Sequence, residues 1–246
     1  MSRSARVAQI GLLIAIATAV VLALAPLGYR MDWWPLRISL YYGIGGAALI
    51  GAVAVIVSFL GAFLTRRTPG AHGFGMALAG LLIAVVAGGY PAAQIMHARR
   101  VPPIHDVTTD TANPPSFVAL APVRKAAPNG LDYAGGDVAA QQKQAYPDVI
   151  TLHSSLAPVD LFARAEKVVA DHGWVVAESV PGEGRLEATD STPMFGFKDD
   201  IVIRVKAADQ GSDLDIRSMS RIGRSDVGKN AARIRGFLEK MKAAGA

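Results

Sequence analysis

The chain divides into an apolar N-terminal part and a C-terminal part in which apolar and polar positions alternate. Three uncharged stretches run from Val7 to Tyr29, from Ile38 to Leu64 and from Thr68 to Ala98. Each can cross a hydrocarbon core of roughly 30 Å as a helix, which takes about 20 residues. The pattern therefore predicts three transmembrane helices that form an anchor over residues 1–100.

The first stretch has an alternative interpretation as a cleaved signal peptide. Arg3 and Arg6 precede it, and the triplet Ala23-Leu24-Ala25 resembles a cleavage site. However, the stretch exceeds the usual apolar core of about 7 to 15 residues, and Pro26 would directly follow the cut. A retained anchor is favoured.

Small residues recur four apart in the second and third stretches, where they would let helix backbones approach closely. Packing within the three-helix unit is the preferred interpretation, and a homo-oligomer interface is the alternative. No charged residue lies in the middle of a span, which disfavours channel and transporter functions. The small residues are Gly43, Ala47, Gly51, Gly80, Ala84 and Gly88.

The arginines that flank the spans do not decide the orientation of the anchor. Four would lie on each side, in the sets Arg3, Arg6, Arg66, Arg67 and Arg30, Arg37, Arg99, Arg100. The first helix often dominates topology, and Asp32 offsets the charge of the first loop. We therefore expect the N-terminus inside and the C-terminal domain outside, in the periplasm if this is a bacterial inner-membrane protein.

Residues 101–121 are proline-rich and polar, which predicts a juxtamembrane linker without regular structure. His105, Asp106 and Asp110 are conceivable metal ligands within it. Local turns made by Asp and Thr side chains are the stronger interpretation, so no metal site and no cofactor are expected.

Residues 122–246 have the pattern of a compact α+β domain. Helical spacing at 158–172 and 226–241 predicts two amphipathic helices, and a short helix is expected at 136–146. An extended piece at 149–155 and four short alternating runs, joined by turn-rich segments, predict about five strands. Sequential strands with short connections imply an antiparallel sheet covered by the two longer helices. The last helix is expected to begin near Asp226 and to bury Val227, Ala231, Ile234, Leu238 and Met241.

Strand alternation places charged residues together on one face of this sheet. If runs 200–205 and 213–217 pair, Asp200, Arg204, Asp215 and Arg217 share a face. A salt-bridge ladder on a solvated face is the preferred interpretation. A functional polar cleft and a catalytic acid pair are the alternatives.

Basic residues concentrate between positions 217 and 235, where six arginines and lysines accompany one aspartate. Ser225 or Asp226 can cap the last helix. Positive charge near a helix N-terminus is unfavourable unless a counter-charge answers it, and Asp213, Asp215 or an external anion could do so. The residues expected to bind an anion or a partner are Arg204, Arg217, Arg221, Arg224, Ser225, Asp226, Asp199 and Asp200.

Composition and motifs exclude several functions. Hydrophobic residues make up 51% and charged residues 18% of the 246 residues, too apolar for an ordinary soluble protein. The absence of cysteine removes disulfide and thiol chemistry. The chain contains no phosphate-binding loop, zinc-binding helix or nucleophile elbow, although His153 beside Ser154 and His172 beside Asp171 could suggest acyl chemistry. The basic residues lack interleaved aromatics, so nucleic-acid binding is not expected.

Several segments resemble the bacterial membrane-anchored branch of the domain of unknown function 1499 family. They include "QQKQAYPDV", "GFKDDIVIRV" and "DIRSMSRIGRSDVGKNAARIRGF", and the resemblance spans roughly residues 101–243. Many relatives carry an Asn-Cys-Val-Ser-like segment where this chain has "NPPSF", which excludes a thiol-based role here. The resemblance implies a fold unit and an envelope or thylakoid-type setting, but no established activity.

We therefore interpret the chain as an integral inner-membrane envelope protein whose α+β domain binds a partner or ligand near the membrane. The expected partners are membrane lipid, an anionic ligand or another envelope protein, with a homo-oligomer as an option. The alternative is a membrane-anchored hydrolase or other enzyme that uses the Asp/Arg face of the sheet.

The topology yields a first testable prediction. With the N-terminus inside, protease added to spheroplasts should digest the chain after residue 101, and a periplasm-dependent reporter fused after Ala246 should be active. Activity of a cytoplasm-dependent reporter at the same position would reverse the topology.

Overall fold

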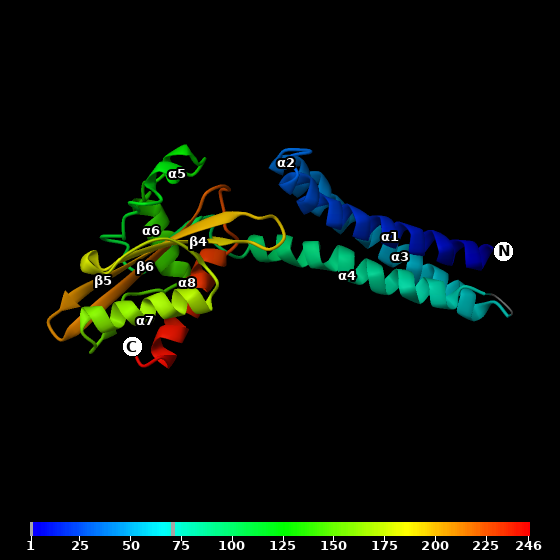
Figure 1. Cartoon of the computed structure of the whole chain (residues 1–246). Helices are drawn as coiled ribbons and strands as arrows, with labels where there is room; N and C mark the ends of the chain where they lie inside the picture. The colour runs from blue at the N-terminus through cyan, green and yellow to red at the C-terminus, as the bar shows by residue number, and fades with distance from the viewer. Residues whose placement is uncertain (1, 70–71) are drawn as a thin grey trace. The chain divides into compact units, whose positions relative to one another are not determined.

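The computed structural model describes residues 2–69 and 72–246, which fall into two compact units, 1–97 and 98–246 (Figure 1). The first unit is helical and the second combines helices with one sheet. Each unit is described by itself.

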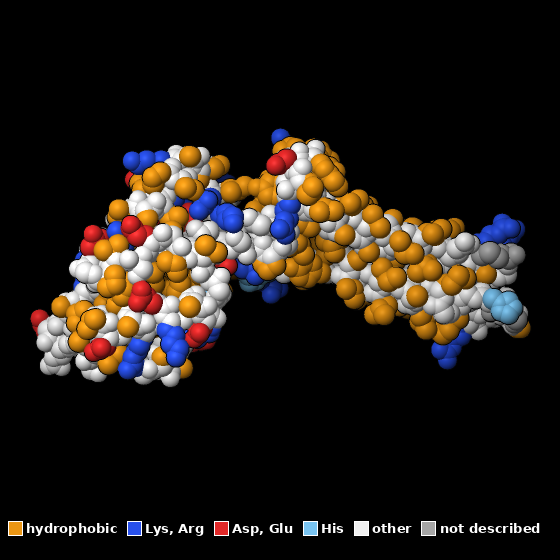
Figure 2. Space-filling view, viewed as in Figure 1, with side chains coloured by type: hydrophobic (Ala, Val, Ile, Leu, Met, Phe, Trp, Pro, Cys, Tyr) orange, Lys and Arg blue, Asp and Glu red, His pale blue; other side chains and the backbone are white. Residues whose placement is uncertain are grey.

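Three long apolar helices make up the first unit. They are α1 (Arg3–Arg30), a helix over Leu36–Arg67 and α4 (Phe74–Ala98), and each is long and apolar enough to cross a membrane. The middle helix consists of α2 (Leu36–Ile38), the π-helical turn η1 (Ser39–Ile44) and α3 (Gly45–Arg67). Hydrophobic side chains cover most of the unit, and the Lys and Arg side chains gather at its ends (Figure 2). The three expected apolar helices are confirmed.

Small residues bring the helices of this unit into backbone contact. A Cβ atom added to Gly51 would lie 2.4 Å from the Cα of Gly88, and one added to Gly80 would lie 2.7 Å from Oγ of Ser58. Ala47 and Ala84 are fully buried. The small residues of α3 and α4 therefore pack within the three-helix unit, as the preferred interpretation requires.

The second unit is built on a six-stranded antiparallel sheet in the order β1-β6-β5-β4-β3. β2 pairs with the same edge of β6 as β1, but nearer the N-terminus of β6. The strands are β1 (Asp106–Thr108), β2 (Leu152–Ser154), β3 (Val175–Val180), β4 (Arg185–Ser191), β5 (Lys198–Ala208) and β6 (Gly211–Ser220). The predicted antiparallel α+β fold is confirmed.

Helices α7 (Pro158–Asp171) and α8 (Lys229–Ala243) cover one face of the sheet with apolar side chains (Figure 1). Ile201, Ile203 and Ile216 point into this core together with Leu161 and Phe237, and all five are buried. Apolar residues at helical and alternating spacing meet on this face, which is why these elements form and pack here.

Helix α8 begins later than the sequence predicts. Val227 adopts a positive φ of 55° and Gly228 one of 77°, so the chain turns there before the helix starts at Lys229. Val227 therefore lies outside the helix, and the expectation that it belongs to the buried stripe is wrong. Ala231, Ile234 and Met241 are buried as expected.

A regular element lies in the segment for which the sequence predicts an unstructured linker. Residues 106–108 form β1, whose three side chains are all buried. The side-chain amide of Gln142, in helix α6 (Gly136–Ala145), accepts a hydrogen bond from the Thr108 amide and donates one to its carbonyl. An alternation of apolar and polar residues does not indicate this strand, because the strand has only three residues. Its outer edge is also bound by the side chain of Gln142 and not by another strand.

Close approach of α3 and α4 predicts a position-dependent effect of adding one methyl group. Gly51→Ala places Cβ against the Gly88 backbone and should lower the stability of the helical unit by about 1–3 kcal/mol. Gly46→Ala in the same helix meets nothing within 4 Å and should be neutral or slightly stabilising. Thermal unfolding of the detergent-solubilised full chain compares the two variants. Equal melting temperatures would contradict the packing described here.

Candidate functional site

The second face of the sheet carries charged side chains from three strands. In the register of β5 and β6, Arg204 lies opposite Asp215, Val202 opposite Arg217 and Asp200 opposite Met219. These residues share one face because side chains alternate along each strand. The grouping that the sequence predicts is therefore confirmed.

This charged face is covered, not solvated. Phe117 and Leu120 lie on Val202 and Met219 and form a second, smaller core with Leu131. Asp200 is fully buried and Arg217 is 3% exposed. The expectation of a wet sheet face is wrong, because residues 117–131 fold over it and bring their own partners for its charges.

Arg124 makes the most deeply buried ion pair of this face. It belongs to helix α5 (Ala121–Ala126), and its Nη1 lies 3.0 Å from Oδ2 of Asp200, with both side chains fully buried. The guanidinium also donates to the carbonyls of Gly130, Met219 and Ser220. Arg124 is therefore satisfied on all sides, as a buried cation requires.

Arg221 completes the coordination of Asp200 from the other side. Its Nε lies 2.9 Å from Oδ2 and its Nη2 lies 2.8 Å from Oδ1, a two-pronged pair. Thr189 donates a further hydrogen bond to Asp200. One carboxylate thus joins α5, β4 and the segment after β6.

Arg217 pairs with a residue 111 positions away. Its Nε and Nη2 donate to the two carboxylate oxygens of Asp106 at 3.0 and 2.8 Å. The ring of Tyr133 lies beside this guanidinium, and burial together with the charge of Asp106 raises the pKa of Tyr133 to about 12. The sequence predicts a counter-charge from Asp213 or Asp215, but Asp106 on β1 supplies it.

Arg204 lies between two carboxylates. Its Nη2 donates to Asp215 at 2.7 Å and to Asp110 at 3.0 Å. Burial opposes ionisation of Asp110, but hydrogen bonds from the Asn113 and Ala112 amides and from Arg204 outweigh it and lower the pKa.

The three conceivable metal ligands, His105, Asp106 and Asp110, do not form a metal cluster. Among residues 2–69 and 72–246, no group of three or more His, Asp or Glu side chains is placed to hold a metal ion.

Glu187 fixes the start of α5. This fully buried carboxylate accepts hydrogen bonds from the amides of Val118, Ala119 and Leu120 at 2.8, 3.1 and 2.9 Å. Arg185 donates to it at 2.6 Å. These three amides belong to the turn that precedes α5, and their hydrogen bonds together with that from Arg185 satisfy the buried carboxylate.

Asp199 is also occupied by an internal partner. Nη2 of Arg233 on α8 lies 2.7 Å from Asp199 and 2.7 Å from Asp190. Asp199 therefore lies on the α8 side of the sheet, and, like Asp200 on the other side, it is engaged by an arginine.

Asp226 lies two residues before Gly228, the N-cap of α8, and its side chain binds amides at the start of this helix. Its carboxylate accepts hydrogen bonds from the amides of Gly228 and Asn230 at 2.7 and 2.8 Å, and burial raises its pKa. Ser225 accepts a weaker bond from the Val227 amide at 3.2 Å. Both residues therefore have local roles at the start of α8.

Two histidines that could suggest acyl chemistry also have structural surroundings. His153 is exposed and pairs with Asp213 at 2.6 Å, while Oγ of Ser154 accepts a bond from the Leu156 amide. His172 stacks on Trp174, and burial lowers its pKa. Neither histidine forms a hydrogen bond with a neighbouring serine in the described residues.

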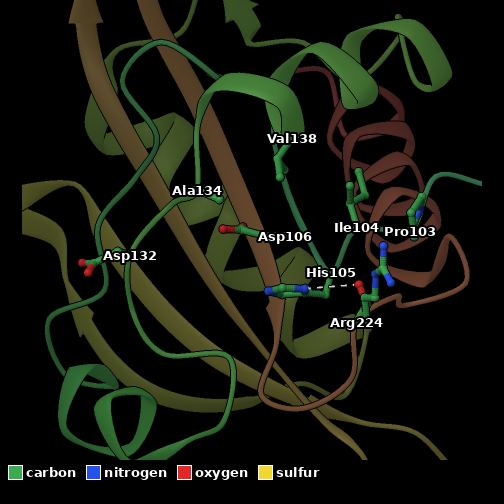
Figure 3. A pocket seen from close by; sticks show the side chains of 8 residues that line it. All are labelled: Pro103, Ile104, His105, Asp106, Asp132, Ala134, Val138 and Arg224. Atoms are coloured by element: carbon green, nitrogen blue, oxygen red, sulfur yellow. Dashed lines mark hydrogen bonds between the residues drawn. The ribbon is translucent and has the colours of Figure 1, made fainter.

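Arg224 differs from the other arginines in the predicted site. It is exposed, and no ion pair involves it in the described parts of the chain. It lines a pocket of about 130 Å³ with Pro103, Ile104, His105, Asp106, Asp132, Ala134 and Val138. Nδ1 of His105 lies 3.4 Å from the Arg224 carbonyl, and the Asp132 carboxylate points away from Arg224 (Figure 3). Of the three arginines that the sequence places at this helix, Arg217 and Arg221 are paired with aspartates, and Arg224 is the one whose guanidinium is exposed.

Sequence reasoning missed Arg124 and Glu187, and it assigned Asp106 to a linker. No local signal indicates these roles, because each side chain also has a partner 67 or more positions away, and that partner places it in the fold. The large number of charged residues on one strand face was the available hint that opposite charges must cover it.

The polar face is assembled from residues 106–221, and these residues lie within a region that matches a known family. The family described as "Protein of unknown function (DUF1499)" matches residues 106–241. The chain belongs to the DUF1499 family. No curated protein matches the sequence. The match covers strands β1 to β6 and most of α8, so the family region of this DUF1499 protein contains both faces of its sheet.

Arg124 should be the arginine whose loss most destabilises this DUF1499 domain. Arg124→Met leaves Asp200 with fewer partners and should lower the free energy of unfolding by about 3–5 kcal/mol. Arg235→Gln removes a pair whose side chains are 37% and 55% exposed, and should cost less than about 1 kcal/mol. Unfolding of the full chain, followed by circular dichroism, measures both. Similar losses would contradict the structural role of the buried pair.

Proposed function

We propose that this protein is a membrane-anchored binding protein whose C-terminal domain holds an anionic ligand in the pocket between His105 and Arg224. The observation that carries the proposal is the contrast between Arg224 and its neighbours. Arg217 and Arg221 each hold a carboxylate with two hydrogen bonds, whereas Arg224 has no carboxylate partner in the described residues. A guanidinium with open donors favours phosphate or carboxylate groups.

The surroundings of Arg224 support this ligand class. His105 contributes an imidazole ring to the pocket lining, next to the guanidinium of Arg224. Pro103, Ile104 and Val138 form an apolar wall. A few polar groups on an apolar wall are typical of small-ligand sites. The ligand is an anionic group, either a free anion or the headgroup of a lipid.

The proposed setting is a bacterial inner membrane with the domain on the periplasmic side. Three helices can span a membrane, and an odd number of crossings puts the two ends of the chain on opposite sides. Family membership adds no activity to this proposal, because the family is described as one of unknown function. A binding role without catalysis is favoured, since the carboxylates of the polar face are engaged by arginines and amides.

Phosphate should stabilise the protein through Arg224. At a concentration 100-fold above its Kd, a ligand that binds only the folded state adds about 2.7 kcal/mol of stability. Inorganic phosphate at low ionic strength should therefore raise the melting temperature of the detergent-solubilised full chain. Arg224→Gln should abolish the rise, whereas Lys206→Gln, which removes one positive charge from an exposed site on β5, should retain it.

The same measurement distinguishes the two sources of the anion. A rise with inorganic phosphate indicates a free anion, whereas a rise only in nanodiscs with phosphatidylglycerol indicates a headgroup. No Arg224-dependent rise in either condition would disprove the proposed function.

A further inference from the structure

The turn between β4 and β5 is a closed, apolar tip. Residues 192–197 read Thr-Pro-Met-Phe-Gly-Phe. The Thr192 amide donates to the Phe197 carbonyl at 2.9 Å, and the Gly196 amide donates to the Thr192 carbonyl at 2.8 Å. The Phe197 amide donates to Oγ1 of Thr192 at 2.9 Å. These bonds hold the tip in one conformation.

The tip combines apolar and basic side chains. The rings of Phe195 and Phe197 stack with their centroids 4.9 Å apart and support the tip from within, since Phe195 is buried and Phe197 is half-buried, whereas Pro193 and Met194 are the exposed apolar residues. Met194 is 39% exposed, and Lys198 is exposed at the base of the tip, where its Nζ donates to Oγ of Ser191. Apolar and aromatic side chains next to a lysine are typical of surfaces that lie in a membrane interface.

The tip lies at the end of the sheet where the chain arrives from α4. Asp199 pairs with Ser220, whose amide donates to the His105 carbonyl, and Asp106 pairs with Met219. The start of β5 is therefore two strands from the start of β1. Adjacent strands are about 4.8 Å apart, which puts the two starts on the order of 10 Å from each other.

The chain segment between α4 and this end of the sheet, here called the tether, is short. α4 ends at Ala98 and β1 begins at Asp106, so seven residues separate them. Seven extended residues span at most about 25 Å. The tether begins with Arg99 and Arg100, both exposed, which adds positive charge at the same end of the domain.

We infer that the 192–197 tip, together with Lys198, Arg99 and Arg100, lies in the headgroup layer of the membrane that α4 crosses, and that anionic lipid strengthens this contact. The tether limits the distance, the tip supplies apolar side chains, and the three cations complement anionic headgroups. This contact holds the domain against the bilayer. It does not involve the His105–Arg224 pocket, so it can fail or succeed independently of the proposed function.

The absence of cysteine from the chain allows a direct test. Met194→Cys and the control Asp209→Cys each introduce a single thiol, the latter in the β5–β6 turn at the opposite end of the sheet. Each full-length variant is labelled with an environment-sensitive fluorophore and reconstituted in nanodiscs. The discs contain zwitterionic lipid, with or without phosphatidylglycerol. Lipids spin-labelled near the headgroup quench a probe in the interface, and iodide quenches a probe in water.

The Met194→Cys probe should be quenched by the spin-labelled lipid and protected from iodide, most strongly in discs with phosphatidylglycerol. The Asp209→Cys probe should show the reverse behaviour. Equal iodide quenching at both positions would overturn the inference. Protection from iodide without quenching by lipid would also overturn it, because a protein surface would then cover the tip.

Two further variants make the test robust. Ser191→Cys is exposed on the same hairpin and serves as a second labelling position if Met194→Cys does not fold. Lys198→Glu in the Met194→Cys background should reduce the difference between anionic and zwitterionic discs. An unchanged difference would overturn the role of Lys198, and screening by added salt should mimic the substitution in a true charge effect.

Discussion

The buried carboxylate of Asp200 constrains the whole C-terminal domain. A charge without solvent is very unfavourable unless partners surround it, so Asp200 can occupy its place on β5 only with Arg124 and Arg221 beside it. Arg124 comes from α5 and Arg221 from the segment after β6. Breaking such a pair is costly, although forming it contributes little net stability. The pair therefore determines where α5 and the 221–224 segment lie more than how stable the domain is.

The two faces of the sheet have different physical roles. The face under α7 and α8 buries Ile201, Ile203 and Ile216 and supplies most of the hydrophobic stabilisation. On the other face, paired charges determine one arrangement of residues 106–131, since each arginine can donate its hydrogen bonds only to a carboxylate at the right position. As a consequence, Arg217 and Arg221, which the sequence predicts to bind an external anion, are neutralised by carboxylates of the domain itself.

The sequence was sufficient for the elements whose residues follow a periodic pattern. The strands β3 to β6 and the helix α7 came from alternation and helical spacing, and strand parity placed Arg204 and Asp215 on one face. It was insufficient where polar partners hold the chain. β1 and α5 depend on pairs with partners far along the chain, and no local pattern identifies which arginine meets which aspartate. The site was correspondingly over-predicted, because Arg217 and Arg221 were counted as available.

Internal pairing also separates the cations that can respond to the surroundings from those that cannot. Arg217 is 3% exposed and lies in direct contact with Asp106, so mobile ions do not reach the pair. Arg224, Lys198 and Arg99 are exposed, and their interactions are screened over a Debye length of about 8 Å at physiological ionic strength. Salt therefore screens the charges of the exposed set, while the buried ion pairs of the polar face persist. The charges of this domain thus divide into buried pairs that specify the fold and exposed cations, such as Arg224, Lys198 and Lys206, whose interactions depend on the surrounding solution.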